Sequence, residues 1–338
     1  MSISLANKDY NSINPEIRAL SLDKVGKNLL VGTIGSEIYE LSIEPASKRV
    51  ENWRFLVRGN SSLRKSRATE LRGLAIVPNT KVFVTVSEDS KLRLWDLDQR
   101  VQLQAVGLDS KARVVEVDET NQQLVIGFAN GTVQLIGRLT GSIEFNRQEF
   151  ETPVTIVRLS PDQSLLAIGS EGGIVKVYKF PSMRNAMLLK HSSAVTNLDW
   201  STSSKVLQTN TKDHKLLFWN TVSGVCIEKG GLDCRDENWA TWTCLYGWPV
   251  KGIMYKQKVP ITSCARSFNV HNNYQLLAAG DMFGNLKLYR YPCIQMEVMH
   301  LVGRGHSSPI SSIRFTRDDK YILTTGLYDG CILQWEIS

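Results

Sequence analysis

The chain has 338 residues, of which 42% are hydrophobic and 22% charged, as in an ordinary globular protein. No apolar run reaches the roughly 20 residues that a membrane-spanning helix needs, and the N-terminus lacks the regions of a signal peptide, so we expect a cytosolic or nuclear protein without a membrane partner. The 40 Lys and Arg exceed the 33 Asp and Glu, which gives a net charge of +7. This charge suits an acidic partner but does not choose among nucleic acid, an anionic membrane and an acidic protein surface.

One short phrase occurs seven times along the chain: a turn of small or polar residues, then an alternating apolar strand that ends in an aromatic or aliphatic residue. The phrases end at Leu41, Trp95, Ile136, Tyr178, Trp219, Tyr289 and Trp335. The middle copies lie 41 or 42 residues apart, whereas the steps to Trp95 and Tyr289 are 54 and 70 residues. A period of about 40 to 45 residues built from short strands is typical of WD40 propeller blades. The sequence therefore predicts an all-β fold, a seven-bladed WD40 β-propeller.

Each phrase follows two further strand-like runs, which completes a blade. Upstream of Tyr178 these runs are Val154–Leu159 and Leu165–Gly169, and Pro161 and Asp162 between them favour a turn. Because one such sheet covers its apolar faces only against neighbours, we expect residues 16–338 to form a single propeller.

Closure of the ring is predicted from the C-terminus. The last phrase ends at Trp335, and the chain ends at Ser338, so the last blade lacks an outer strand. We expect the N-terminal segment, residues 1–15, to supply it, with the strand around Ser2–Ala6.

Polar residues at equivalent positions predict a hydrogen-bond network inside the blades. His306, Thr324 or Thr325, Asp329 and Trp335 are spaced to connect a loop between blades with an indole nitrogen. The same separation of six residues joins Asp89 to Trp95 and Asp213 to Trp219. Buried networks of this kind fix loops, so we interpret these residues as structural.

The sequence predicts no cofactor, no metal and no catalysis. Its six cysteines show no Cys-x-x-Cys spacing and its five histidines are scattered, which favours reduced thiols over a zinc site. A nucleophile elbow and a phosphate loop are also missing from the sequence.

The first long step contains an insertion near residues 45–70. Five basic residues occur within fifteen positions, opposed by Glu70 alone. They are Arg58, Arg64, Lys65, Arg67 and Arg72. Such a run is either a solvated loop or an electrostatic contact for an acidic partner, and we name these five residues as candidate partner-binding residues.

The second insertion, residues 222–260, carries Trp239, Trp242 and Trp248 within ten positions. Alternation around residues 239–244 predicts an added strand, with residues 250–255 as its partner. A tryptophan cluster of this kind either pins an insertion onto the fold or offers an aromatic contact, and we expect at least one of the three rings to be partly exposed. All three are candidate partner-binding residues.

Several strings give the chain a specific resemblance to a known family. They are Ala19–Asp23, Leu30–Thr33, Ser36–Ile38, Asn238–Thr243, Gly280–Cys293 and Gly305–Phe315. In this order, and with the insertion, the chain resembles the C-terminal propeller of the echinoderm microtubule-associated protein-like family over roughly residues 16–338. That family carries a tandem propeller unit, so an upstream propeller in the same polypeptide is among the partners that the resemblance implies.

The resemblance implies a non-enzymatic interaction scaffold of the microtubule cytoskeleton, located on microtubules of the cytoplasm, spindle or cilium. Its partners would be tubulin, microtubules or other microtubule-associated proteins. One alternative is a WD40 adaptor of a different complex. Another is nucleic-acid or phosphoinositide binding through the basic surface, which the sequence supports less because its aromatic residues are not interleaved with the basic run.

Overall fold

A computed structural model describes residues 17–33, 38–44, 49–57, 69–120, 123–138, 141–254, 259–270, 273–295 and 298–337. These residues form seven antiparallel sheets of three or four strands. The predicted all-β propeller class, with its seven sheets, is confirmed. No helix among the described residues is long and apolar enough to cross a membrane.

The strands follow one another as simple meanders. The first three sheets contain β1 (Ile17–Leu22), β2 (Asn28–Thr33), β3 (Ile38–Glu44) and β4 (Arg49–Val57); β5 (Leu71–Ile76), β6 (Val82–Ser87), β7 (Lys91–Asp96) and β8 (Gln102–Gly107); and β9 (Ala112–Val117), β10 (Gln123–Phe128), β11 (Thr132–Gly137) and β12 (Ile143–Gln148). The next two contain β13 (Val154–Leu159), β14 (Leu165–Ser170), β15 (Ile174–Lys179) and β16 (Arg184–Lys190); and β17 (Val195–Trp200), β18 (Val206–Thr211) and β19 (Leu216–Asn220). The last two contain β20 (Ile261–Arg266), β21 (Gln275–Asp281), β22 (Asn285–Tyr291) and β23 (Leu301–Arg304); and β24 (Ile310–Phe315), β25 (Tyr321–Gly326) and β26 (Ile332–Glu336).

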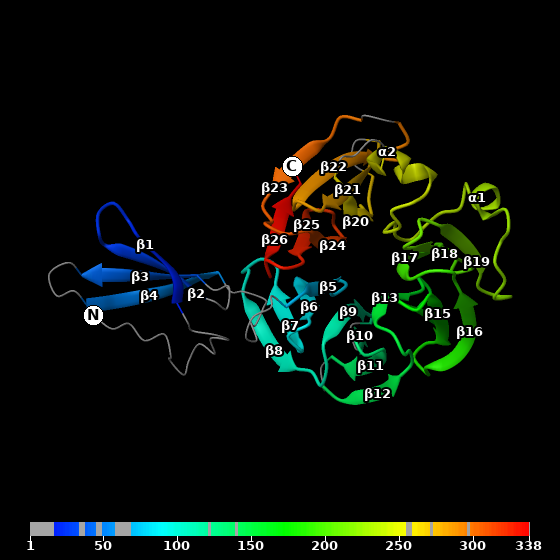
Figure 1. The fold of residues 1–338 in the computed structure, drawn as a ribbon, viewed down its shortest axis with the longest axis horizontal. Helices are drawn as coiled ribbons and strands as arrows, with labels where there is room; N and C mark the ends of the chain where they lie inside the picture. Colours follow the sequence, from blue (N-terminus) through cyan, green and yellow to red (C-terminus); the bar gives the residue numbers. More distant parts are fainter. Residues whose placement is uncertain are drawn as a thin grey trace.

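Six of these sheets stand around a common axis with their first strands innermost (Figure 1). β5 packs on β9, β9 on β13, β13 on β17 and β20 on β24. The ring closes where β24 and β25 pack on β5, and the amide of Leu71 donates to the carbonyl of Leu327 at 2.9 Å. The sheet of β1 to β4 lies beside this ring in Figure 1. The sequence predicts one propeller over residues 16–338, and the ring contacts of the described residues run from β5 to β26.

The second insertion takes the place of a sheet between β17–β19 and β20–β23. Its backbone joins the first of these sheets where the amide of Ala240 donates to the carbonyl of Trp200 at 2.9 Å. It joins the other sheet where Cys264 Sγ lies 3.3 Å from the carbonyl of Thr243. The ring therefore has seven sectors, of which six are sheets and one is the irregular insertion.

The expected hairpin in this insertion is wrong. Instead of paired strands, residues 222–260 contain α1 (Gly230–Asp233), the 3-10 helix η2 (Trp248–Val250) and α2 (Lys251–Met254). Side-chain hydrogen bonds from threonines 241 and 243, described below, replace the ladder bonds that a strand would make.

The core lies between neighbouring sheets of the ring, whose second strands are almost wholly buried. β6, β10, β14 and β25 each bury their last five residues, as expected for strands covered on both faces. Outer strands are exposed, as in β12. Small residues permit the close approach: a Cβ on Gly127 would overlap side-chain atoms of Val114 in its own sheet and of Val154 in the next sheet.

The predicted closing strand lies outside the described residues, since these begin at residue 17. The last sheet has three strands among the residues that the structure describes, in the order β24-β25-β26. Its closure by residues 1–15 stays a prediction.

Candidate interaction surfaces

The basic run of the first insertion lies mostly outside the described residues: Arg58, Arg64, Lys65 and Arg67 belong to that part of the chain. Arg72, at the start of β5, is described, and its Nε donates to a Glu70 carboxylate oxygen at 2.6 Å. Of the five residues, Arg72 is thus the one whose contacts the structure describes.

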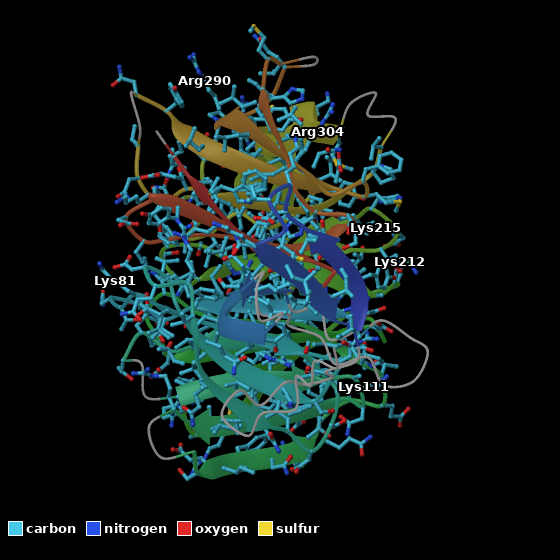
Figure 2. The ribbon with its side chains drawn as sticks, turned by 90° about the vertical axis from the view of Figure 1, so that its left-hand side faces the viewer. Lys81, Lys111, Lys212, Lys215, Arg290 and Arg304 are labelled. Carbon is cyan, nitrogen blue, oxygen red and sulfur yellow. The ribbon has the colours of Figure 1, made fainter. Side chains whose placement is uncertain are left out.

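One face of the ring, which we call the strand-start face, gathers Arg72, Lys111, Arg113, Lys212 and Lys215. Figure 2 shows the ring edge-on, with Lys111, Lys212 and Lys215 along one side and Lys81 along the other. These side chains come from the starts of the inner strands β5 and β9 and from the turn after β18.

Carboxylates on the strand-start face balance most of this charge. Arg113 bridges Glu88 at 3.2 Å and Glu171 at 2.5 Å. Lys215 lies 2.9 Å from Asp213. Lys212 is exposed, and no carboxylate of the described residues is within ion-pair distance of it. The face therefore presents a network of ion pairs with a small positive surplus.

Two cavities that share lining residues form an axial channel through the ring. The fifth residues of the six inner strands are Ala75, Glu116, Arg158, Asp199, Ala265 and Arg314. All except Asp199 line a cavity of about 230 Å³ formed by the strand ends. A second cavity of about 620 Å³ opens among the strand starts, and Arg158, Arg314 and Thr243 line both.

Asp199 is covered by the insertion. Its carboxylate accepts hydrogen bonds from the Thr241 hydroxyl at 2.6 Å, from the Thr243 amide at 2.8 Å and from the Cys244 amide at 3.0 Å. The Gln208 side-chain amide donates a further bond at 3.2 Å. One buried carboxylate thus anchors the irregular sector to β17.

Two of the three candidate tryptophans are structural. Trp239 and Trp242 are 6% and 2% exposed, and their rings meet edge to face with centroids 6.1 Å apart. They fill the space between Phe218 and Tyr291 of the adjoining sheets. Trp248 is 43% exposed, and Arg235 lies 5.8 Å from its ring centre. Of the three, Trp248 therefore offers a contact surface, and the assignment of Trp239 and Trp242 to partner contact is corrected to packing.

The polar network of the last sheet has the predicted members. His306 Nδ1 lies 3.2 Å from Asp329, and its Nε2 lies 2.8 Å from the Thr324 hydroxyl. The indole of Trp335 donates to the same hydroxyl at 2.9 Å.

The blades of Asp89 and Asp213 form the equivalent network with different residues. Trp95 donates to Thr85 at 2.8 Å, while Asp89 holds Arg93, a residue with 0% exposure, at 2.6 Å in a buried ion pair. No histidine takes part among the described contacts of this pair; the arginine supplies the positive charge.

The blade of Asp213 and Trp219 contains a histidine that the sequence analysis missed. His191 Nε2 lies 2.8 Å from Thr209, the hydroxyl to which Trp219 donates, and Asp213 accepts from Ser192 at 3.0 Å. A signal was present: His191-Ser192-Ser193 and His306-Ser307-Ser308 precede β17 and β24 at equal distances.

All six cysteines are free thiols. Burial raises the pKa of Cys244 and of Cys264 well above the ordinary value, which keeps both as thiols. The described residues contain no group of three or more His, Cys, Asp or Glu side chains placed to hold a metal ion.

Comparison with known proteins finds a family model and several relatives that match this chain. The family model of the echinoderm microtubule-associated protein second beta-propeller matches residues 71–337. The chain is 31% identical over 320 residues to human echinoderm microtubule-associated protein-like 2, covering 92% of the chain and 46% of the relative. It is 28% identical over 328 residues to mouse echinoderm microtubule-associated protein-like 3, covering 95% and 35%. The 77 kDa echinoderm microtubule-associated protein of Lytechinus variegatus is 29% identical, with 82% and 42% covered. The chain thus spans less than half the length of these relatives.

Proposed function

The chain belongs to the echinoderm microtubule-associated protein family, and on this premise we propose that it is a non-enzymatic interaction scaffold of the microtubule cytoskeleton. Its partners in this proposal are tubulin, microtubules or another microtubule-associated protein, and its location is the cytoplasmic cytoskeleton. The observation that carries the proposal is the family match over residues 71–337, which includes every strand from β5 to β26.

The environment of the axial carboxylates supports a scaffold over an enzyme. Glu116 accepts from Arg158 at 2.9 Å, and the carboxylate of Asp199 is occupied by donors of the insertion. A general base needs a carboxylate that can accept a proton from a substrate. Here both groups act in holding the fold.

Charge supports the choice of an acidic partner. The chain carries a net charge of +7, and tubulin is acidic, so long-range attraction would favour their encounter. We propose that the contact involves the basic run of Arg58, Arg64, Lys65, Arg67 and Arg72, together with Lys111 and Lys212 of the strand-start face. Trp248 is proposed as a separate aromatic contact on the insertion, since its ring is exposed.

Sedimentation with microtubules tests the proposal. We expect the chain to pellet with microtubules at about 50 mM salt and to pellet much less at about 200 mM, because screening weakens contacts between exposed charges. Replacing Arg64, Lys65 and Arg67 by Glu should reduce the pelleted fraction, and so should Lys111→Glu with Lys212→Glu.

A matched control uses the same change of charge elsewhere: Lys81→Glu with Arg290→Glu, both labelled on the side opposite to Lys111 and Lys212 in Figure 2. Equal loss in the Lys111/Lys212 and Lys81/Arg290 pairs would mean that only net charge matters. Absence of pelleting at low salt, both by the chain and by a longer polypeptide that carries an upstream propeller, would refute the tubulin contact.

A further inference from the structure

The cavity of about 230 Å³ at the strand-end side of the channel contains arginines that no carboxylate neutralises. We propose that this cavity binds a small, multiply charged oxyanion, such as a phosphate or polyphosphate group, between Arg266 and Arg314. Both residues line it, and they come from the adjacent inner strands β20 and β24. The proposed scaffold function does not require this site.

Arg314 lies between two small side chains. The equivalent positions on the neighbouring inner strands are Ala265 on one side and Ala75 on the other, and both alanines line the same cavity. Its Nη1 donates to the carbonyl of Ile313 at 2.8 Å. No carboxylate of the described residues lies within ion-pair distance of this guanidinium. The alanines therefore leave room for a ligand where other positions around the channel carry an acid.

Arg266 is the second cation of the proposed site. Its Nη2 donates to the carbonyl of Trp239 at 2.5 Å, and its guanidinium lies 5.3 Å from the ring centre of Tyr291. Its Nε is buried and has no hydrogen-bond partner among the described residues. A buried donor without a partner is costly, so a ligand oxygen that reached it would be stabilising.

The other arginines of the cavity are already neutralised. Arg158 pairs with Glu116 at 2.9 Å, and Arg317 pairs with Glu119. The acids that line the cavity are these two glutamates. Arg266 and Arg314 remain as the cations whose charge a bound anion would compensate.

Titration behaviour agrees with this geometry. Burial lowers the pKa of Arg314 to about 9, and repulsion from Arg158 adds to this shift, while Glu116 and Asp199 offset only part of it. The guanidinium is still charged at neutral pH, so its positive charge destabilises the empty ring. A bound anion would remove part of that destabilisation.

The chemistry of the donors favours phosphate over chloride or a single carboxylate. A guanidinium presents two parallel N–H groups that match two oxygens of one phosphate, and two guanidinium groups together match its double charge. The cavity is enclosed by inner strands from different sheets, so it suits a free anion and excludes a nucleic-acid duplex or a bilayer surface.

Titration calorimetry and thermal unfolding of the chain with inorganic phosphate and with pyrophosphate test the site, with sodium chloride at equal ionic strength as reference. We expect saturable binding of at least one of the two anions and a rise in Tm that chloride does not produce. Arg314→Gln should weaken binding by about tenfold or more, since a charge-assisted contact is lost. The same variant should have a higher Tm than the wild type without anion, because it removes an uncompensated buried charge.

Arg304→Gln, at the end of outer strand β23, is the matched control and should bind like the wild type. Arg266→Gln should also weaken binding. If Arg266→Gln fails to fold, Arg314→Gln still tests the site. Equal binding by the wild type and Arg314→Gln would overturn the proposal, and so would binding that neither anion saturates.

Discussion

His191 and Trp219 meet at the hydroxyl of Thr209, His191 through Nε2 at 2.8 Å and Trp219 through its indole N–H at 3.0 Å. The indole can only donate, so the hydroxyl accepts from Trp219 and is free to direct its own proton toward the histidine. His191 Nδ1 is buried without a partner among the described residues. With Nε2 accepting from this hydroxyl, the neutral ring holds its proton on Nδ1, and protonation of Nε2 would remove that acceptor.

Acid should destabilise the fold through His191. Burial lowers the pKa of His191 below its ordinary value of 6.5, although backbone hydrogen bonds and Asp213 oppose the shift. The neutral form is thus favoured in the folded state, and the free energy of unfolding is fully retained above pH 6.5 and falls as pH drops below it. Urea denaturation at about pH 7.5 and about pH 5.5 should show a smaller pH effect in His191→Gln than in the wild type. His300→Gln, an exposed control, should keep the wild-type pH effect; an unchanged pH effect in His191→Gln would contradict this reading.

The shared hydroxyl of Thr324 should be equally important for the last sheet. Thr324→Val keeps the shape but leaves Trp335 and His306 without their common partner, so we expect a loss of about 1–3 kcal/mol in the free energy of unfolding. Thr132→Val, at a half-buried position of β11, is the control and should cost much less. Chemical denaturation of both variants measures the difference, and equal costs would deny the hydroxyl a special role.

The anchoring carboxylate should govern the irregular sector. Asp199→Asn removes the charge that accepts from Thr241, Thr243 and Cys244, and we expect a loss of about 3 kcal/mol. Limited proteolysis should then cut within residues 222–260 sooner than in the wild type. Asp233→Asn, an exposed substitution in α1, should leave the cleavage rate unchanged, and slow cleavage in both variants would argue against the anchor.

Two glycines with positive φ allow the stability cost of steric overlap to be measured apart from the cost of backbone strain. Gly131 has φ +83°, and a Cβ there would overlap the carbonyl oxygen of Phe150, whereas Gly141 has φ +66° and open space around it. Gly131→Ala should therefore cost at least about 2 kcal/mol more than Gly141→Ala, which carries only the left-handed penalty of about 1–2 kcal/mol. Thermal and urea unfolding compare the two, and similar losses would mean that the turn after β10 relaxes easily.

We expect the buried and the exposed tryptophans of the insertion to differ in their contribution to stability. Trp242→Ala leaves a cavity between two sheets and should cost about 3–5 kcal/mol, while Trp248→Ala should change stability little. In the sedimentation assay Trp248→Ala should lower microtubule binding at unchanged Tm. A large stability loss in Trp248→Ala would show that its ring, too, belongs to the core.

Most of the fold could be predicted from the repeat pattern because each blade forms from residues that are close together in the chain. Each sheet is a meander of consecutive strands, so the phrases ending at Trp95 and Trp335 could be placed from spacing alone. The network of His306 was predictable for the same reason, since its members occupy fixed positions within one blade. The basic run of Arg64 to Arg67 stays a prediction.

Contacts between distant segments were not predictable in this way. The alternating residues from Trp239 to Cys244 suggested a strand, but Asp199 offers them side-chain acceptors that replace a ladder, and no local pattern reveals that. Likewise, Arg266 and Arg314 lie 48 residues apart in the chain, and only the ring brings their guanidinium groups to one cavity. The direct packing of β24 on β5 also depends on how many sectors the ring accommodates.

The joint between β17 and β20 differs in kind from the other joints described around the ring. Elsewhere one inner strand presses on the next, whereas here the connection passes through irregular backbone fastened to a single acidic group. Transient opening of the circle should therefore begin at this joint, and amide protons of residues 238–246 should exchange with solvent before those of the inner strands. A ligand that reaches the axis of the ring without unfolding the protein would be expected to enter at this joint.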